Sequence, residues 1–587
     1  MRDSASLQQE GAAAPEDPRE LHQPQSSTGA DDDSAYTVAE AIDSVGVGKF
    51  QLLMLLYVGF AWMADAMEMM ILSFLGPAMR CQWKLDAGKE SLITSVVFAG
   101  TMLGAYSWGW LSDAKGRRIG FFGTAMFSFM FGILSALAPN YQLLIAARFF
   151  VGVGLGGVPA SFALFMEFLP TSDRAKWLVV LQGFWTVGTV VEAGLAWLVL
   201  YPLGWRWLLA LSSLPLFLLT LLFPLLPESP FFLVSVGRTA AAQQVLQRVA
   251  HINGRPLPKG RLKGRQEPSL ELSHPKDQPA PLELPALGPL GPPVAAFLQQ
   301  LRGIYTRDLA ITSCCFQFVW FVNALAYYGV VLLTTSIHGG DASESGAGCG
   351  EDGRLNISNK DFLAILITSA AEMPGLLIAA LLIDIIGRRR TVAGGIFVTG
   401  LFILPLAFNP PVDTVFLFGA RAAEMGAFTS LYIYTPEAYP TAVRSFGLGI
   451  ANMCSRVGAV LAPFFAVYLV RQHLASFVEV FMAASCFLAA AAGLCIPIET
   501  AGRSLLGDAE GGAPVKDRGQ DSGTSLLPFW QQQGRKPPEH LQRRSPTADS
   551  PFSGRSSEHS NSSNHWQEGQ DGRAMLLRDA ARHDHGQ

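Results

Sequence analysis

Four short sequence patterns occur twice in this chain, in the same order and about 270 residues apart. They are a charged Asp-x-x-Gly-Arg-Arg turn, an arginine within an apolar run, a Glu-x-x-Pro-x-x-x-Arg segment and an acidic turn. They lie at 113–118, 148, 167–174 and 227–230, and again at 384–389, 421, 437–444 and 497–500. This order predicts two structurally equivalent halves. A repeat of this kind in membrane helices is typical of secondary transporters, whose substrate site lies between the halves.

The apolar runs between these patterns predict membrane helices. Half of the 587 residues are hydrophobic and 15% are charged, whereas soluble domains carry about 25% charged residues. A membrane-spanning helix needs about 20 apolar residues. We predict an all-α membrane protein with twelve transmembrane helices in two pseudo-symmetric six-helix bundles. The spans are expected near 50–78, 90–112, 119–138, 141–165, 177–201, 205–226, 309–337, 361–385, 391–408, 412–435, 443–470 and 475–497.

Composition also predicts how the rest of the chain is organised. Polar segments rich in Pro, Gly, Ser and Gln are expected to be disordered. We expect amphipathic helices in the connector near 239–250 and 294–302. The predicted parts are a disordered N-terminal tail (1–48), a first bundle (49–226), a connector (227–308), a second bundle (309–497) and a disordered C-terminal tail (498–587).

Lysine and arginine in the loops predict the orientation. The loops after spans 2, 4, 6, 8 and 10 are basic, whereas most of the others are not, which places both termini in the cytoplasm. The sequence leaves open whether this is the plasma membrane or the membrane of an internal compartment or vesicle. Asn356 begins a glycosylation sequon in the long loop 338–360 on the other side, and is a candidate modification site.

The seven cysteines are too few and too scattered for a disulfide framework or a metal site. Cys81 and Cys349 fall in loops on the same predicted side and can therefore pair. The simpler interpretation, which we adopt here, is two free thiols. We expect no metal and no cofactor.

Charged residues within the spans are the strongest functional signal. Each costs about 2.5–3.5 kcal/mol at mid-bilayer, so they must pair or line a wet cavity. We expect Arg148 to hold Asp65 ionised in one state, and Asp65 to take up a proton when the pair separates. Glu68 lies on the same helix face as Asp65. The alternative is a static ion pair that only fixes helix packing.

Other buried polar and aromatic residues are candidates to line a central cavity. Carboxylates there favour a cationic or zwitterionic substrate, while arginines allow an anionic group. The alternative for the aromatic residues is helix packing. The candidates are Trp185, Glu192, Asn323, Tyr327, Tyr328, Glu372, Arg421, Glu424 and Arg456.

The repeated charged turns predict a latch on the cytoplasmic face. We expect Glu167 to pair with Arg118 or Arg174, and Glu437 to pair with Arg389 or Arg444. Such a latch closes when the site opens outward and breaks when it opens inward. The alternative is loop charges that only set orientation. The whole set is Asp113, Arg117, Arg118, Glu167, Arg174, Asp384, Arg388, Arg389, Glu437 and Arg444.

Taken together, these residues resemble the major facilitator superfamily over 36–506. The paired turns, Arg148-x-x-x-Gly152-x-Gly154 and the Pro-Glu-Ser-Pro turn are similar to its sugar-porter and organic-ion branches. Residues 61–70 in span 1, with 320–324 and 327–335 in span 7, resemble synaptic-vesicle-related proteins and plant organic cation/carnitine or nicotinate transporters. The resemblance implies alternating access. In proton-coupled sugar porters a span 1 aspartate beside the span 4 arginine carries the proton, and Asp65 and Arg148 match these positions.

Two positions depart from the superfamily pattern. Ala114 replaces a basic residue and Ala380 replaces a glycine, which leaves the strength of the latch open.

We therefore expect a secondary active transporter of a small organic cation, zwitterion or monocarboxylate, coupled to protons. Its partners would be the lipid bilayer, the substrate and protons, without nucleic acid, and we expect a monomer. The alternative is a membrane receptor or vesicle component that keeps the fold without turnover. An enzyme is not expected, because the Gly-x-Gly-x-x-Gly spelling at 152–157 lies inside an apolar span, where it favours helix packing over nucleotide binding.

Overall fold

The computed structural model describes residues 35–157, 159–171, 173–264, 292–338, 349, 355, 357–408, 410, 412–440 and 443–500. These residues all belong to one compact unit. The parts of the predicted tails at 1–34 and 501–587, the middle of the connector at 265–291 and the sequon residue Asn356 lie outside the described residues.

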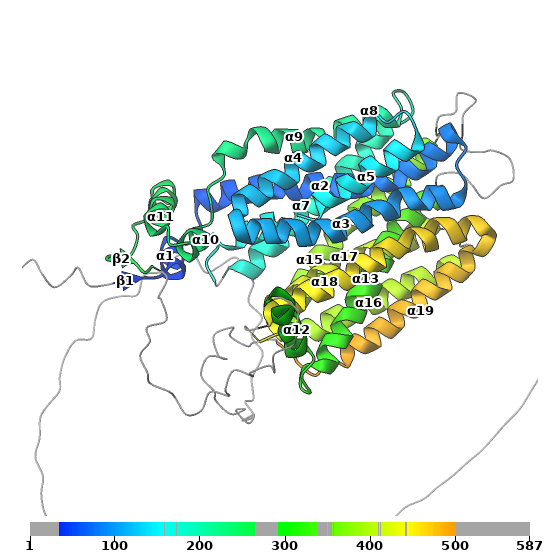
Figure 1. Cartoon of the computed structure of the whole chain (residues 1–587). Helices are drawn as coiled ribbons and strands as arrows, with labels where there is room; N and C mark the ends of the chain where they lie inside the picture. Colours follow the sequence, from blue (N-terminus) through cyan, green and yellow to red (C-terminus); the bar gives the residue numbers. More distant parts are fainter. Residues whose placement is uncertain are drawn as a thin grey trace, which may run out of the picture. The chain divides into compact units, whose positions relative to one another are not determined.

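Twelve helical spans in two groups of six confirm the predicted fold class (Figure 1). The first group, blue to green, is α2 (Lys49–Trp83), α3 (Ala87–Lys115), α4 (Arg117–Ala136), α5 with α6 (Tyr141–Leu155, Pro159–Met166), α7 (Arg174–Val199), and α8 with α9 and η1 (Trp205–Ser212, Leu214–Leu221, Phe223–Leu225). The second is α13 (Ala310–His338), α14 with α15 (Asn359–Ala370, Glu372–Ile385), α16 with η2 (Arg388–Ile403, Leu404–Phe408), α17 (Asp413–Ala438), α18 with η3 (Arg444–Pro463, Phe464–Leu474) and α19 (Ala475–Leu494).

Close approach of helix backbones explains the glycine-rich run in span 4. A Cβ atom on Gly152 would lie 2.1 Å from the Val97 carbonyl oxygen of α3, and one on Gly156 would lie 2.4 Å from the Ala105 nitrogen. Contacts below 3.0 Å leave no room for a side chain. The glycine-rich run therefore allows close helix packing, as predicted.

A small folded unit lies at one end of the first bundle. It comprises β1 (Ala35–Tyr36), α1 (Val38–Val45), α10 (Pro230–Ser235), α11 (Thr239–Asn253) and β2 (Arg261–Leu262), and β1 pairs with β2 in parallel (Figure 1). The expectation of a disordered segment up to residue 48 was therefore wrong for 35–48. Apolar side chains such as Tyr36 and Ile42 are buried against Leu246 and Leu262 of the connector, which the composition of the tail did not reveal.

The two amphipathic helices predicted in the connector are present as α11 and α12 (Pro292–Ile304). We call the end of the molecule that carries the small folded unit the connector face. The opposite end, where α2 and α7 terminate, is the distal face.

A disulfide joins Cys81 to Cys349, with their Cα atoms 5.3 Å apart. The expectation of two free thiols was wrong. Cys81 lies near the distal end of α2 in the first half, and Cys349 lies in the loop between α13 and α14 of the second half. Residue spacing alone did not show that Cys349 lies beside Cys81. The bond therefore links the two halves covalently at the distal face.

Thiol labelling checks this disulfide. With a maleimide mass tag on denatured protein, prior reduction should expose two additional reactive thiols in the wild type. The Cys81→Ser variant should gain none on reduction, because it leaves Cys349 already free. Equal labelling of the wild type before and after reduction would contradict the bond.

Candidate functional site

The two halves meet along two seams. In one, the Glu90 carboxylate of α3 binds Arg471 of η3 at 3.0 Å, and Ser95 Oγ donates to the Val460 carbonyl of α18 at 2.9 Å. In the other, Trp197 of α7 donates to Asn359 Oδ1 of α14 at 3.0 Å. These bonds lie in the distal part of the spans, so the described structure is closed at the distal face.

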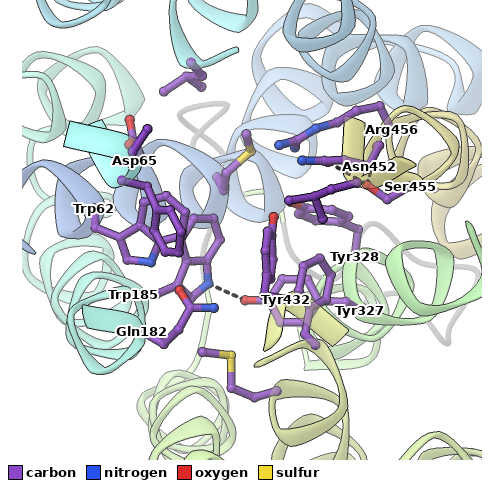
Figure 2. A pocket seen from close by; sticks show the side chains of 17 residues that line it. Trp62, Asp65, Gln182, Trp185, Tyr327, Tyr328, Tyr432, Asn452, Ser455 and Arg456 are labelled. Atoms are coloured by element: carbon purple, nitrogen blue, oxygen red, sulfur yellow. Dashed lines mark hydrogen bonds between the residues drawn. The ribbon is translucent and has the colours of Figure 1, made fainter. Parts of the chain in front are cut away.

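A cavity of about 250 Å³ lies between the halves, on the connector side of these seams (Figure 2). Spans 1, 4 and 5 of the first half and spans 7, 10 and 11 of the second half contribute to it. The lining residues are Trp62, Asp65, Met69, Leu155, Phe162, Ala163, Gln182, Trp185, Tyr327, Tyr328, Met425, Phe428, Tyr432, Leu448, Asn452, Ser455 and Arg456.

Aromatic rings form much of the cavity wall. The centroids of the Trp62 and Trp185 rings are 5.5 Å apart, and Trp185 Nε1 donates to Tyr327 Oη across the halves at 2.7 Å. The ring of Phe428 packs edge-on against Tyr327. Such a box can hold a flat ring by stacking or a quaternary ammonium by cation–π attraction.

Two residues of opposite charge lie on different walls of this cavity. Figure 2 shows Asp65 beside Trp62 on the first-half wall, and Arg456 with Asn452 on the second-half wall. They are the two charged members among the described lining residues.

Two polar groups on the lining have no hydrogen-bond partner within the described ranges, namely Trp62 Nε1 and Gln182 Oε1. Buried polar groups are normally paired. Unpaired groups on a cavity wall are thus positioned to bind a polar ligand.

The predicted cavity residues divide into two groups. Trp185, Tyr327, Tyr328 and Arg456 line the cavity. Glu192, Asn323, Glu372, Arg421 and Glu424 are buried but are not among its lining residues, so their assignment to the cavity wall was wrong. Glu192 is bound inside the first half by Ser212, whereas Glu372 lies behind Tyr327 at the interface between the halves.

Sequence reasoning missed several lining residues, including Trp62, Gln182, Tyr432, Asn452 and Ser455. Helical spacing could have found some of them. Trp62 lies one turn before Asp65, and Asn452 lies one turn before Arg456, so each shares a helix face with its charged neighbour.

The first half is built around a buried ion pair. Arg148 Nη1 contacts Glu68 Oε2 at 3.1 Å, and neither side chain is exposed. Ser213 Oγ donates to Glu68 at 3.3 Å, and Glu192 accepts from Ser212 at 2.8 Å. The expected partner of Arg148 was Asp65, and for this conformation that was wrong. The two acids lie three residues apart on α2, which leaves Asp65 on the cavity wall and turns Glu68 toward α5.

The second half has its own buried ion pair, in which the acid comes from span 8 rather than span 1. Arg421 Nη2 contacts Glu372 Oε1 at 2.6 Å, and Tyr327 Oη donates to the same oxygen at 3.0 Å. Thr189 of the first half donates to Glu372 Oε2 at 3.3 Å. Glu372 therefore connects the ion pair of the second half, the cavity wall and the other half of the molecule.

At the connector face, each half forms its own charged cluster. Arg117 contacts Asp113 at 2.8 Å and Glu167 at 3.4 Å. Burial raises the pKa of Glu167, an effect that Ser229 and Arg117 oppose.

The equivalent cluster in the second half repeats this geometry. Arg388 contacts both Asp384 and Glu437 at 3.1 Å. The Thr500 hydroxyl donates to Glu437 Oε2 at 2.7 Å.

The predicted partners within these clusters were wrong, because the first arginine of each turn reaches the glutamate. Arg118 instead lies over the Phe223 ring, and Arg389 donates to the Ile496 carbonyl. Arg174 and Arg444 donate to the carbonyls of Leu169 and Tyr439. The first arginine starts its helix directly after a glycine with a positive φ, and across this break it contacts the aspartate four residues before it.

Comparison with known proteins decides the family. The model of the "Sugar (and other) transporter" family matches residues 67–507. The chain belongs to this transporter family, within the major facilitator superfamily. Organic cation/carnitine transporter 7 of Arabidopsis thaliana is 43% identical to it over 498 residues, covering 81% of this chain and 97% of that protein.

Other relatives of this transporter carry different names. The synaptic vesicle 2-related protein of Xenopus laevis is 39% identical, covering 81% of this chain and 83% of that protein. The partially occluded inward-open structure of the E. coli xylose transporter XylE has a TM-score of 0.59 at 15% identity, covering 78% of this chain and 99% of that one. This last likeness shows the fold.

Removing one member of the first buried pair should destabilise the transporter strongly. Glu68→Gln leaves the Arg148 charge buried without a counterion, at a cost of about 3–5 kcal/mol. Unfolding of the purified protein in detergent measures the loss. Asp173→Asn, which breaks an exposed pair with Lys176, should cost less than about 1 kcal/mol. Equal losses in the two variants would contradict a buried, structurally required pair.

Proposed function

We propose that this transporter moves a compact organic zwitterion or monocarboxylate through the central cavity by alternating access, coupled to protons. The observation that carries the proposal is the aromatic cavity with Asp65 on one wall and Arg456 on the other. A zwitterion satisfies both charges, and an apolar or aromatic body fills the space between them.

The Arg456 end favours a carboxylate. A guanidinium presents donors in a planar fork that matches the two oxygens of a carboxylate. The Ser455 hydroxyl next to it donates to the Asn452 backbone carbonyl at 2.7 Å, and the side-chain amide of Asn452 on the cavity wall can also donate to a carboxylate. The aromatic end suits a quaternary ammonium.

Carnitine combines these two groups, and the Arabidopsis relative is named an organic cation/carnitine transporter. We therefore take carnitine as the first substrate to test. Tetraethylammonium, which lacks a carboxylate, separates the contribution of the aromatic box from that of Arg456.

With the connector face in the cytoplasm, as the basic loops favour, the closed distal seams make this conformation inward-facing. Outward opening then requires the distal ion pair and hydrogen bonds between the halves to break, with the Cys81–Cys349 disulfide still in place. The charged clusters at the connector face hold spans 2, 3 and 4, and spans 8, 9 and 10, as rigid groups during that motion.

Asp65 is our proposed carrier of the coupling proton. It is 7% exposed, lies on the cavity wall and sits one helical turn before the Glu68–Arg148 pair. Arg148 is therefore near enough to release Glu68 and pair with Asp65 when the halves move. An ionised Asp65 paired with Arg148 in one state, and a protonated Asp65 in the other, would couple a proton to the cycle.

Substitution of Arg456 tests the carboxylate site. Arg456→Gln removes charge-assisted hydrogen bonds worth about 1.5–3 kcal/mol, so carnitine uptake into proteoliposomes should fall about tenfold or more. Tetraethylammonium uptake should fall less than carnitine uptake. Arg390→Gln, an exposed arginine at the connector face, is the control. An equal fall for both substrates would reject the site.

Substitution of Asp65 tests proton coupling. In proteoliposomes with an imposed pH gradient, carnitine uptake by the wild type should rise with the gradient. Asp65→Asn fixes the side chain in a neutral form, and its uptake should respond less to the gradient than that of the wild type. If both respond equally, Asp65 does not carry the proton. If the wild type moves none of the cations, zwitterions or monocarboxylates tested, the receptor interpretation gains support.

A further inference from the structure

Glu424 is a buried acid of the second half that the substrate cavity does not use. It lies on α17, its side chain is fully buried, and it is not among the described residues that line the cavity. Neither of its carboxyl oxygens has a hydrogen-bond partner within the described ranges. An ionised carboxylate in such a place would be strongly disfavoured, whereas a protonated one carries no charge.

The groups around Glu424 are neutral. Thr399 of α16 and the Cys486 thiol of α19 face it. Backbone from α15 lies close to α17 here, since a Cβ on Gly375 would come 1.9 Å from the Ala422 carbonyl. The charged residue that α15 supplies nearby, Glu372, is bound to Arg421.

The hydrogen-bond capacity of Thr399 also favours a proton on Glu424. The Thr399 hydroxyl donates its hydrogen to the Gly395 carbonyl at 3.0 Å. A hydroxyl has one hydrogen, so toward Glu424 it can only accept. The Thr399 hydroxyl therefore supplies no hydrogen bond that would stabilise an ionised Glu424 carboxylate.

Arg421 can take the place of that proton. It lies three residues before Glu424 on α17, a spacing that puts two side chains on one helix face. It contacts Glu372 through Nη2, while its Nε and Nη1 atoms have no partner within the described residues. The guanidinium thus has unused donors one turn from an acid without a counterion.

Movement of the halves can trigger the exchange. Glu372 is held by Arg421 from its own half and by the Thr189 hydroxyl from the other half. Separation of the halves at the distal face breaks the bond to Thr189 and lets water reach Glu372. Arg421 is then free to turn toward Glu424.

We propose that Glu424 is a second proton-binding site of the transport cycle, loaded in this conformation, whose proton is displaced by Arg421 when the distal face opens. The proton leaves the carboxyl group for water, Arg421 becomes the counterion of the Glu424 carboxylate, and the Glu372 carboxylate that Arg421 leaves is solvated by the water admitted at the distal face. This inference rests on the proposed proton-coupled transport and adds a site in the second half, away from the cavity.

Infrared spectroscopy tests the proton directly and needs no substrate. At neutral pH the reconstituted wild type should show a protonated-carboxyl C=O band that is absent in Glu424→Gln. Asp113→Asn, which changes an exposed carboxylate, should leave the band in place. Identical spectra for the wild type and Glu424→Gln in the carboxyl region would overturn the proposal.

Accumulation of carnitine tests the role in transport. At zero membrane potential, a gradient of one pH unit drives about tenfold accumulation per coupled proton and about a hundredfold for two. Wild type should reach about a hundredfold, and Glu424→Gln should stop at about tenfold. The same accumulation in both proteins, with the infrared band present, would make Glu424 a structural acid and overturn the proposal. If the wild type does not move carnitine, carnitine is rejected as the substrate. The infrared spectrum then tests by itself whether Glu424 is protonated.

Discussion

The cost of placing charge in a hydrocarbon interior governs this structure. At least eight charged side chains lie within its spans, and each must be paired, solvated in the cavity or neutral. The charged residues are stabilised in different ways in different parts of the structure. Arg148 and Arg421 each bind one acid in a fully buried pair, Asp65 and Arg456 face the cavity, and Glu424 has no charged partner among the residues described.

Pseudo-symmetry relates the two halves, but their buried pairs are not equivalent. Arg148 binds an acid from span 1, inside its own half. Arg421 binds an acid from span 8 that is also held by Thr189 across the interface. The first pair fixes packing within one bundle. The second pair connects packing to the interface that must open and close, so movement of the halves reaches it directly through Thr189.

Sequence reasoning performed best where the evidence is local. The spans, the two halves and the glycine packing of span 4 follow from runs and spacings of neighbouring residues. It performed worst in predicting which arginine pairs with which acid. Arg148 was assigned to Asp65 rather than Glu68, and Glu167 to Arg118 rather than Arg117, although the correct residue lies three positions or one position away. A difference of one position rotates a side chain by about 100° around a helix of 3.6 residues per turn, which is enough to exchange a cavity wall for a bundle interior.

By itself, the sequence determined that the chain spans a membrane twelve times in two related halves, because hydrophobic length and repeated charged turns are properties of the chain. Tertiary structure alone decided which acid meets which arginine, that Cys81 and Cys349 join, and which side chains enclose the cavity. These contacts connect residues that are tens to hundreds of positions apart. They depend on how each helix is rotated and how far it tilts, and those quantities are set by the packing of all twelve spans together.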